Sequence, residues 1–144
     1  MSALGLLLVF TAGSLFAIAI WFGYGRNREV VSEVEILNPG GQSGTALVVY
    51  HLGRSDFQRR VFSGFAEGLV SSGWRVEMTA PSPETPADLS GYDLLVIGGP
   101  TYGFTPNRPI KRYLRRLGDL AGKPTVTIIT GLGAAEGSSA KMQE

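Results

Sequence analysis

The sequence predicts an α/β domain with a parallel sheet, preceded by one apolar helix. Residues 45–129 alternate between short apolar runs and amphipathic stretches, a pattern typical of strand–helix–strand units. The short runs are rich in Val, Ile and Leu at consecutive positions, as strands buried on both faces are. Residues 3–22 carry no charged side chain. The length of 144 residues is enough for one domain and little more.

Composition and charge exclude several kinds of functional site. The chain has no cysteine, which excludes disulfides, thiolate zinc sites and cysteine nucleophiles. The single histidine, His51, is interpreted as a structural residue, so we predict no metal site and no catalytic triad. The net charge of +1 argues against a nucleic-acid partner. Chemistry must therefore come from a bound cofactor or from backbone groups.

The charge-free segment Ala3–Phe22 predicts a transmembrane anchor over residues 1–24. Its helical length is about 30 Å, the thickness of a bilayer's hydrocarbon core, so residues 3–22 would contact membrane lipid. Arg26 and Arg28 follow the segment and predict a single-pass membrane protein with a cytoplasmic C-terminal domain. A cleaved signal peptide and a buried core helix are the two alternatives.

The rest of the chain divides into a linker and one domain. Residues 25–44 are predicted to be a flexible linker. RNREVVSEVEIL at its start fits a short strand or a helical extension, whereas NPGGQSG at residues 38–44 is too rich in Gly, Pro and Ser for regular structure. Residues 45–144 are the predicted domain. Its expected elements, in chain order, are strand 46–50, helix 56–70, strand 74–78, strand 92–97, helix 107–117 and strand 124–129.

Each predicted helix has an apolar face that is expected to cover the sheet. In the first helix, the residues recurring every four positions are Phe57, Val61, Phe65 and Leu69. In the second helix, the inward residues are Ile110, Tyr113, Leu114 and Leu117. Either Ser55 or Asp56 is expected to cap the first helix. Ligands of such sheets bind at the carboxyl ends of the strands, which here lead into the segments 51–55, 98–105 and 130–137.

The third predicted strand and its loop resemble the flavodoxin family. The run YDLLVIGGPTYG at residues 92–103 contains an apolar strand, then Gly, a small residue, Pro, Thr and an aromatic, as flavodoxin-like proteins do. The resemblance covers residues 45–144 and implies a three-layer sandwich with a parallel sheet of strand order 2-1-3-4. It also implies that a fifth strand is missing and that the domain is incomplete at its C-terminus.

The resemblance implies FMN as the cofactor. Gly98 and Gly99 would let the backbone approach the flavin ring, and Tyr102 would stack on it, contributing about 1 kcal/mol beyond its buried area. The cofactor-binding residues that the resemblance implies are Gly53, Arg54, Ser55, Gly98, Gly99, Pro100, Thr101, Tyr102, Gly103, Thr130 and Gly131.

The loop after the first predicted strand departs from the family pattern. Leu52 and Phe57 stand where hydroxyl residues are expected around the FMN phosphate. Asp56 adds a negative charge beside that position, whereas Arg54 is the loop's cation and would bind the phosphate.

These features lead to two functional hypotheses. The first is a membrane-anchored flavodoxin-like protein that binds FMN and exchanges electrons with a redox partner protein, as a carrier or an FMN-dependent oxidoreductase. The alternative is a non-catalytic interaction module of flavodoxin shape with a degenerate phosphate loop. Loop residues Leu52 and Phe57 favour the alternative, and the run 98–102 favours FMN binding.

Overall fold

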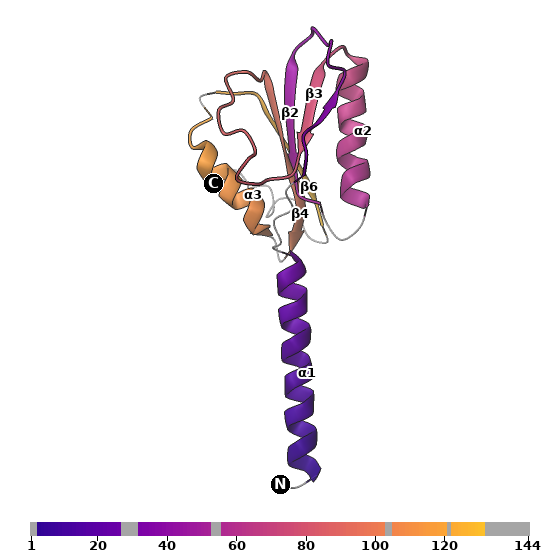
Figure 1. The fold of residues 1–144 in the computed structure, drawn as a ribbon, viewed down its shortest axis with the longest axis vertical. Helices are drawn as coiled ribbons and strands as arrows, with labels where there is room; N and C mark the ends of the chain where they lie inside the picture. The colour runs from indigo at the N-terminus through magenta and orange to yellow at the C-terminus, as the bar shows by residue number, and fades with distance from the viewer. Residues whose placement is uncertain (1–2, 27–31, 53–55, 103–104, 121, 132–144) are drawn as a thin grey trace.

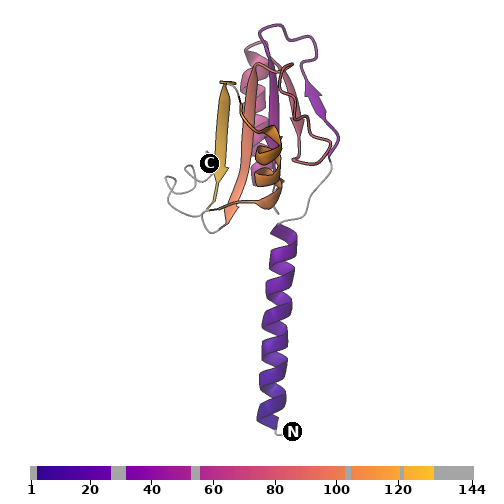
Figure 2. The ribbon, with the colours of Figure 1, turned by 90° about the vertical axis from the view of Figure 1, so that its left-hand side faces the viewer.

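A central sheet flanked by two helices forms the α/β part of the chain, and a third helix extends away from it (Figures 1 and 2). The computed structural model describes residues 3–26, 32–52, 56–102, 105–120 and 122–131. The elements in chain order are α1 (Ala3–Arg26), β1 (Glu35–Leu37), β2 (Thr45–Tyr50), α2 (Phe57–Ser71), β3 (Arg75–Thr79), β4 (Leu94–Tyr102), β5 (Thr105–Pro106), α3 (Arg108–Leu117) and β6 (Thr125–Thr130).

Four strands of the sheet are parallel and lie in the spatial order β3-β2-β4-β6. These are the four strands expected from the sequence, and their order is the expected one. β2 is central: its Val48 pairs with Met78 of β3 on one side and with Val96 of β4 on the other. Because β2 has a strand on each side and a helix over each face, Ala46 to Tyr50 are all buried.

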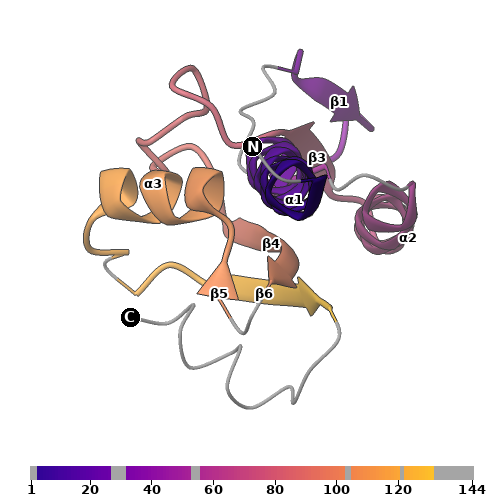
Figure 3. The ribbon, with the colours of Figure 1, turned by 90° about the horizontal axis from the view of Figure 1, so that it is seen from below.

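The two helices cover opposite faces of the sheet, as the view from below shows (Figure 3). Side chains of a strand alternate between faces. Val48 and Tyr50 of β2 therefore pack with Phe62 of α2. On the other face, Val49 of β2 packs with Ile110 of α3.

The sheet-facing side of α2 is rotated by one residue from the prediction. Its buried residues are Gln58, Phe62 and Ala66. Phe57, expected to face the sheet, is 50% exposed. Phe65 and Leu69 are only partly buried, at the border of the contact. Apolar side chains occupy two adjacent stripes of this helix, and the small Ala66 lets the stripe of Phe62 approach β2 closely.

The apolar face of α3 is the predicted one. Ile110 and Tyr113 are almost fully buried, and Leu114 and Leu117 pack against them. Asn107 begins the helix, since its side-chain oxygen accepts a hydrogen bond from the backbone N–H of Ile110 at 3.1 Å. Asn107 thus satisfies one of the N–H groups that a helix start leaves unpaired.

The sheet is mixed, which corrects the prediction of a purely parallel one. β1 pairs antiparallel with β3, and β5 forms a short antiparallel pair with the end of β4. β1 lies in the segment predicted to be a flexible linker. The turn after it is held by the Asn38 amide, which donates to the carbonyl of Trp74 at 3.0 Å, and by Ser43 N–H, which donates to Gly73 at 3.1 Å.

The predicted transmembrane anchor is also corrected. Across the described ranges, no helix combines the length and the apolar character that a membrane span requires. This finding overturns the predictions of an anchor over residues 1–24 and of a single-pass membrane location. The prediction of a missing fifth strand stays a prediction, because residues 132–144 lie outside the described part of the chain.

Candidate functional site

The carboxyl ends of β2, β4 and β6 lie side by side and form the candidate site. Tyr50 at the end of β2 pairs with Gly98 of β4, and Pro100 of β4 pairs with Thr130 of β6. The described part of the predicted site is therefore brought together at one edge of the sheet. It comprises Gly98, Gly99, Pro100, Thr101, Thr130 and Gly131.

The remaining predicted site residues are not placed by the structure. Gly53, Arg54 and Ser55 of the phosphate loop lie outside the described residues, and so does Gly103. Tyr102 is the last residue of β4, but its side chain is not described. The stacking role of Tyr102 and the phosphate role of Arg54 stay predictions.

Residues 98–102, expected to be a loop after the strand, are the C-terminal part of β4, and the glycines there face protein atoms instead of open space. A Cβ on Gly98 would lie 1.8 Å from the carbonyl oxygen of Ile128, in the neighbouring strand β6. A Cβ on Gly99, whose φ is +155°, would lie 3.2 Å from the Cβ of His51. Glycine is needed here because the strands approach closely, and this reason differs from the predicted approach to a flavin ring.

Asn107 places an unpaired hydrogen-bond donor at this edge. The side chain is 5% exposed, and its oxygen is used by the α3 cap. Its amide nitrogen is buried and has no hydrogen-bond partner among the residues described. That nitrogen would lie 3.4 Å from a Cβ on Gly99, which places it beside the C-terminal part of β4. A buried amide donor without a partner costs about 1–3 kcal/mol, so a ligand acceptor at this point would recover that cost.

Two more unpaired polar atoms lie at the same edge, toward α2. Gln58, in the first turn of α2, is 6% exposed, and its Oε1 has no partner within the described ranges. The hydroxyl oxygen of Thr130, at the end of β6, is likewise buried and unpartnered there. Strand alternation puts Thr130 on the same face as Ile128, the face that α2 covers. The edge thus offers an amide donor on one face and two oxygens on the other.

His51 follows β2 and lies beside Gly98 and Gly99 of β4. Its backbone N–H donates to the carbonyl of Gly98 at 3.1 Å, and its side chain is 4% exposed. Burial lowers the pKa of His51 below its usual value of 6.5. The imidazole is therefore neutral at pH 7, and it adds an uncharged polar group to the edge.

This pKa shift predicts an acid-dependent loss of stability. Because the pKa of His51 is lower in the folded state, the unfolded chain binds more protons as the pH falls below about 6.5. The free energy of unfolding should therefore decrease as the pH falls through this range. We expect urea titrations at a series of pH values to show this slope, and His51→Gln to flatten it. An equal slope in the variant would assign the pH dependence to other groups.

Two of these features, Gln58 and Asn107, could not be identified from the sequence as parts of a site. Gln58 was hidden among the apolar residues of α2, and Asn107 was recognised only as a helix start. Asp56 occupies the position before α2, but its side chain makes no capping hydrogen bond, contrary to one of the two predicted caps. An Asn directly before Arg-Pro does signal a helix N-cap, but its unpaired amide is visible only in three dimensions.

Comparisons with known proteins identify no family. No family model matches the chain, and no curated protein matches it.

Proposed function

We propose that the edge formed by β2, β4 and β6 binds FMN and that the protein takes part in electron transfer. The observation that carries the proposal is the buried amide nitrogen of Asn107, which lies near Gly99 in the C-terminal part of β4 and has no partner in the described structure. The flavodoxin-like run 98–102 forms this part of β4. The parallel strands β2, β4 and β6 end beside one another there, the usual position of ligands in such sheets.

The unpaired polar atoms fit the hydrogen-bonding groups of FMN. A flavin ring offers carbonyl oxygens and ring nitrogens that accept hydrogen bonds, and the amide of Asn107 would donate to one of them. Ring N–H and ribityl hydroxyl groups are donors, and Gln58 and Thr130 supply buried oxygens that accept. The position beside Gly98 does not contribute to this fit, because the backbone of Ile128 fills it.

The protein's own residues would bind and orient the group, while FMN supplies one- and two-electron redox chemistry when bound. Asn107 is held rigidly by its hydrogen bond from Ile110, so its free amide is pre-oriented. His51 is buried beside Gly99 and neutral, so it limits water access without adding charge. Arg54 remains the predicted ligand of the phosphate.

Replacing the donor while keeping the helix cap tests the proposal. Asn107→Asp retains an oxygen that can accept from Ile110, and Asp is as good an N-cap as Asn. It removes the amide donor, so the affinities for FMN and riboflavin should both fall about tenfold or more. We would measure both affinities by flavin fluorescence titration and check folding by circular dichroism.

The matched control is Gln42→Glu, which makes the same amide-to-acid change at an exposed position before β2. This variant should bind riboflavin as the unchanged protein does. An equal loss of riboflavin affinity in both variants would show a general effect of the added charge, and it would contradict the proposed hydrogen bond from Asn107 to the flavin. Riboflavin lacks the phosphate, so its response separates the ring contact from phosphate repulsion.

One observation favours the alternative, a non-catalytic interaction module. Atoms of Ile128 and His51 occupy the space beside Gly98 and Gly99 in β4, as they would in a protein that holds no flavin ring there. A folded protein that binds neither FMN nor riboflavin would reject the flavin proposal and support this alternative.

A further inference from the structure

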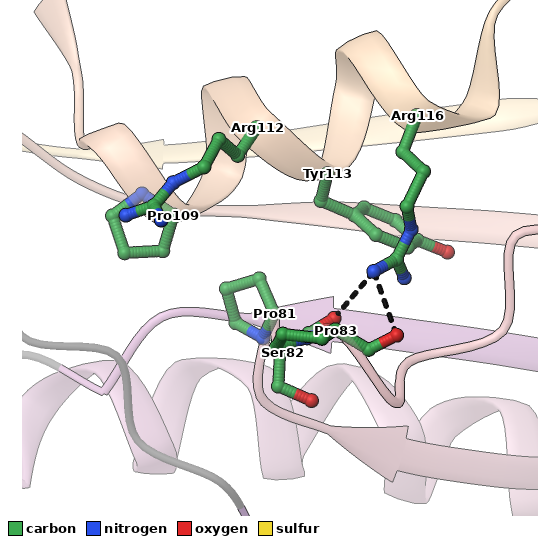
Figure 4. Close-up of a pocket in the computed structure, with 7 residues that line it drawn as sticks. All are labelled: Pro81, Ser82, Pro83, Pro109, Arg112, Tyr113 and Arg116. Atoms are coloured by element: carbon green, nitrogen blue, oxygen red, sulfur yellow. Dashed lines mark hydrogen bonds between the residues drawn. The ribbon is translucent and has the colours of Figure 1, made fainter.

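A pocket lies between α3 and the loop that follows β3, apart from the edge residues discussed above. Its volume is about 260 Å³. Three prolines, a serine, a tyrosine and two arginines line it: Pro81, Ser82, Pro83, Pro109, Arg112, Tyr113 and Arg116 (Figure 4). This volume is somewhat below the usual range for drug-sized ligands, so the pocket suits a smaller molecule.

Arg116 is locked in place by neutral groups. Its Nη1 donates to the carbonyls of Ser82 at 2.9 Å and Pro83 at 2.8 Å, and its Nη2 donates to the carbonyl of Thr85. The guanidinium also lies 5.5 Å from the centre of the Tyr113 ring. Among the described residues, no carboxylate forms an ion pair with Arg116. These three carbonyls accept from Nη1 and Nη2 but do not cancel the charge of the guanidinium, so Arg116 keeps a positive charge at the pocket.

The loop opposite α3 is also rigid. The hydroxyl of Thr85 donates to the carbonyl of Ala80 at 2.7 Å and accepts from the backbone N–H of Ser82 at 2.9 Å. Ser82 and Thr85 are both buried. A ligand entering this pocket therefore finds Pro81 and Pro83 already placed, and little conformational entropy is lost on binding.

Like charges recur along α3 beside the pocket. Arg108, Arg112 and Arg116 are spaced four residues apart, and the helix contains no acidic residue. Like charges at this spacing destabilise a helix by a few tenths of a kcal/mol per pair. The structure thus concentrates positive charge at the pocket at a small cost to the helix, and an anionic ligand would relieve the repulsion. Figure 4 shows Arg112 and Arg116 on the same wall, with Pro81 and Pro83 opposite.

We propose that this pocket binds a small organic anion, a carboxylate or phosphate group on an apolar body about the size of one ring. The anionic group lies against Arg112 and Arg116 and is attracted by their positive charges. The apolar body packs against Tyr113 and the rings of Pro81 and Pro109. The proposal does not depend on FMN binding, because none of the atoms proposed to hold FMN lines this pocket.

Simple aromatic probes test the charge requirement. Benzoate, phenyl phosphate, inorganic phosphate and the neutral benzamide would be titrated into the full chain and followed by ¹H–¹⁵N NMR. Benzoate or phenyl phosphate should shift the amides of Ser82 and Tyr113, and the better of them should bind at least about tenfold more tightly than benzamide. The two anions together show which oxyanion is preferred. Equal binding of benzamide, or no shift at these amides with any organic probe, would overturn the proposal.

A matched pair of variants tests the position of the charge. Arg112→Gln removes a positive charge from the pocket wall, and Arg115→Gln removes the same charge from an exposed position on α3 outside the pocket. The first should weaken binding of the preferred anion about tenfold, and the second less than twofold. Equal losses would show that the basic helix attracts anions without a specific site. Inorganic phosphate binding as tightly as the organic anions would remove the role of the apolar wall.

Discussion

Gly98→Ala is expected to lower the free energy of unfolding by at least about 3 kcal/mol. Gly98 lies in β4 between β2 and β6, paired with Tyr50 on one side and Ile128 on the other. An added Cβ would lie 1.8 Å from the carbonyl oxygen of Ile128, far inside van der Waals contact. The obstacle is backbone of a paired strand and cannot rotate away as a side chain would, so β4 and β6 must separate.

The measurement is urea unfolding followed by circular dichroism, with Gly64→Ala as the matched control. Gly64 lies inside α2, and nothing lies within 4 Å of a Cβ at that position. Alanine there should stabilise the protein by about 0.5–1 kcal/mol, because glycine is a poor residue inside a helix. The same chemical change thus has opposite signs at the two positions. A Gly98→Ala protein as stable as the unchanged one would show that β4 and β6 do not pair as described.

Phe62→Ala is expected to lower the free energy of unfolding by about 3–5 kcal/mol. Phe62 is completely buried, and its ring stacks on that of Tyr50 with centroids 4.9 Å apart. This contact is central to the packing of α2 on the sheet. Removing the ring leaves a cavity bounded by β2 and β4, two strands whose pairing prevents them from collapsing into it.

Phe57→Ala is the control in the same helix. Phe57 is 50% exposed, so its truncation should cost less than about 1 kcal/mol. The comparison also tests which side of α2 faces the sheet. If Phe57→Ala were the more damaging variant, the face expected from the sequence would be right and the packing of Phe62 described above would be wrong.

The sequence was sufficient to predict an element where its pattern of apolar and polar residues fits only one arrangement in the fold. Consecutive apolar residues such as Leu47, Val48 and Val49 have no polar face, so they require a strand buried on both sides. α3 was predicted with its correct face because its charged and apolar residues lie on different sides of the helix. In α2, aromatic residues occupy adjacent stripes, and only the shape of the sheet selects Phe62 over Phe57.

Other features depend on contacts between residues far apart in the sequence. β1 could not be distinguished from a helical extension because three residues give no periodicity, and its pairing with β3 joins positions about 40 residues apart. The prediction of a membrane anchor relied on the charge-free run 3–22 and on Arg26 and Arg28 after it, and the structure does not support it. The pocket beside Arg116 depends on carbonyl groups of residues 82–85, whose orientation no sequence pattern encodes.

The short strand β1 also has a consequence for self-association. A sheet edge with open N–H and C=O groups is a template on which another chain can add a strand, the first step of fibril growth. Glu35 to Leu37 occupy the outer side of β3, opposite Val76 to Met78, and Glu33 and Glu35 add exposed negative charge there. The apolar Val76 and Met78 are thus shielded from templated growth. β1 itself becomes the edge strand on this side, and its three residues and the nearby charges of Glu33 and Glu35 leave a short, charged edge that is a poor template for another strand.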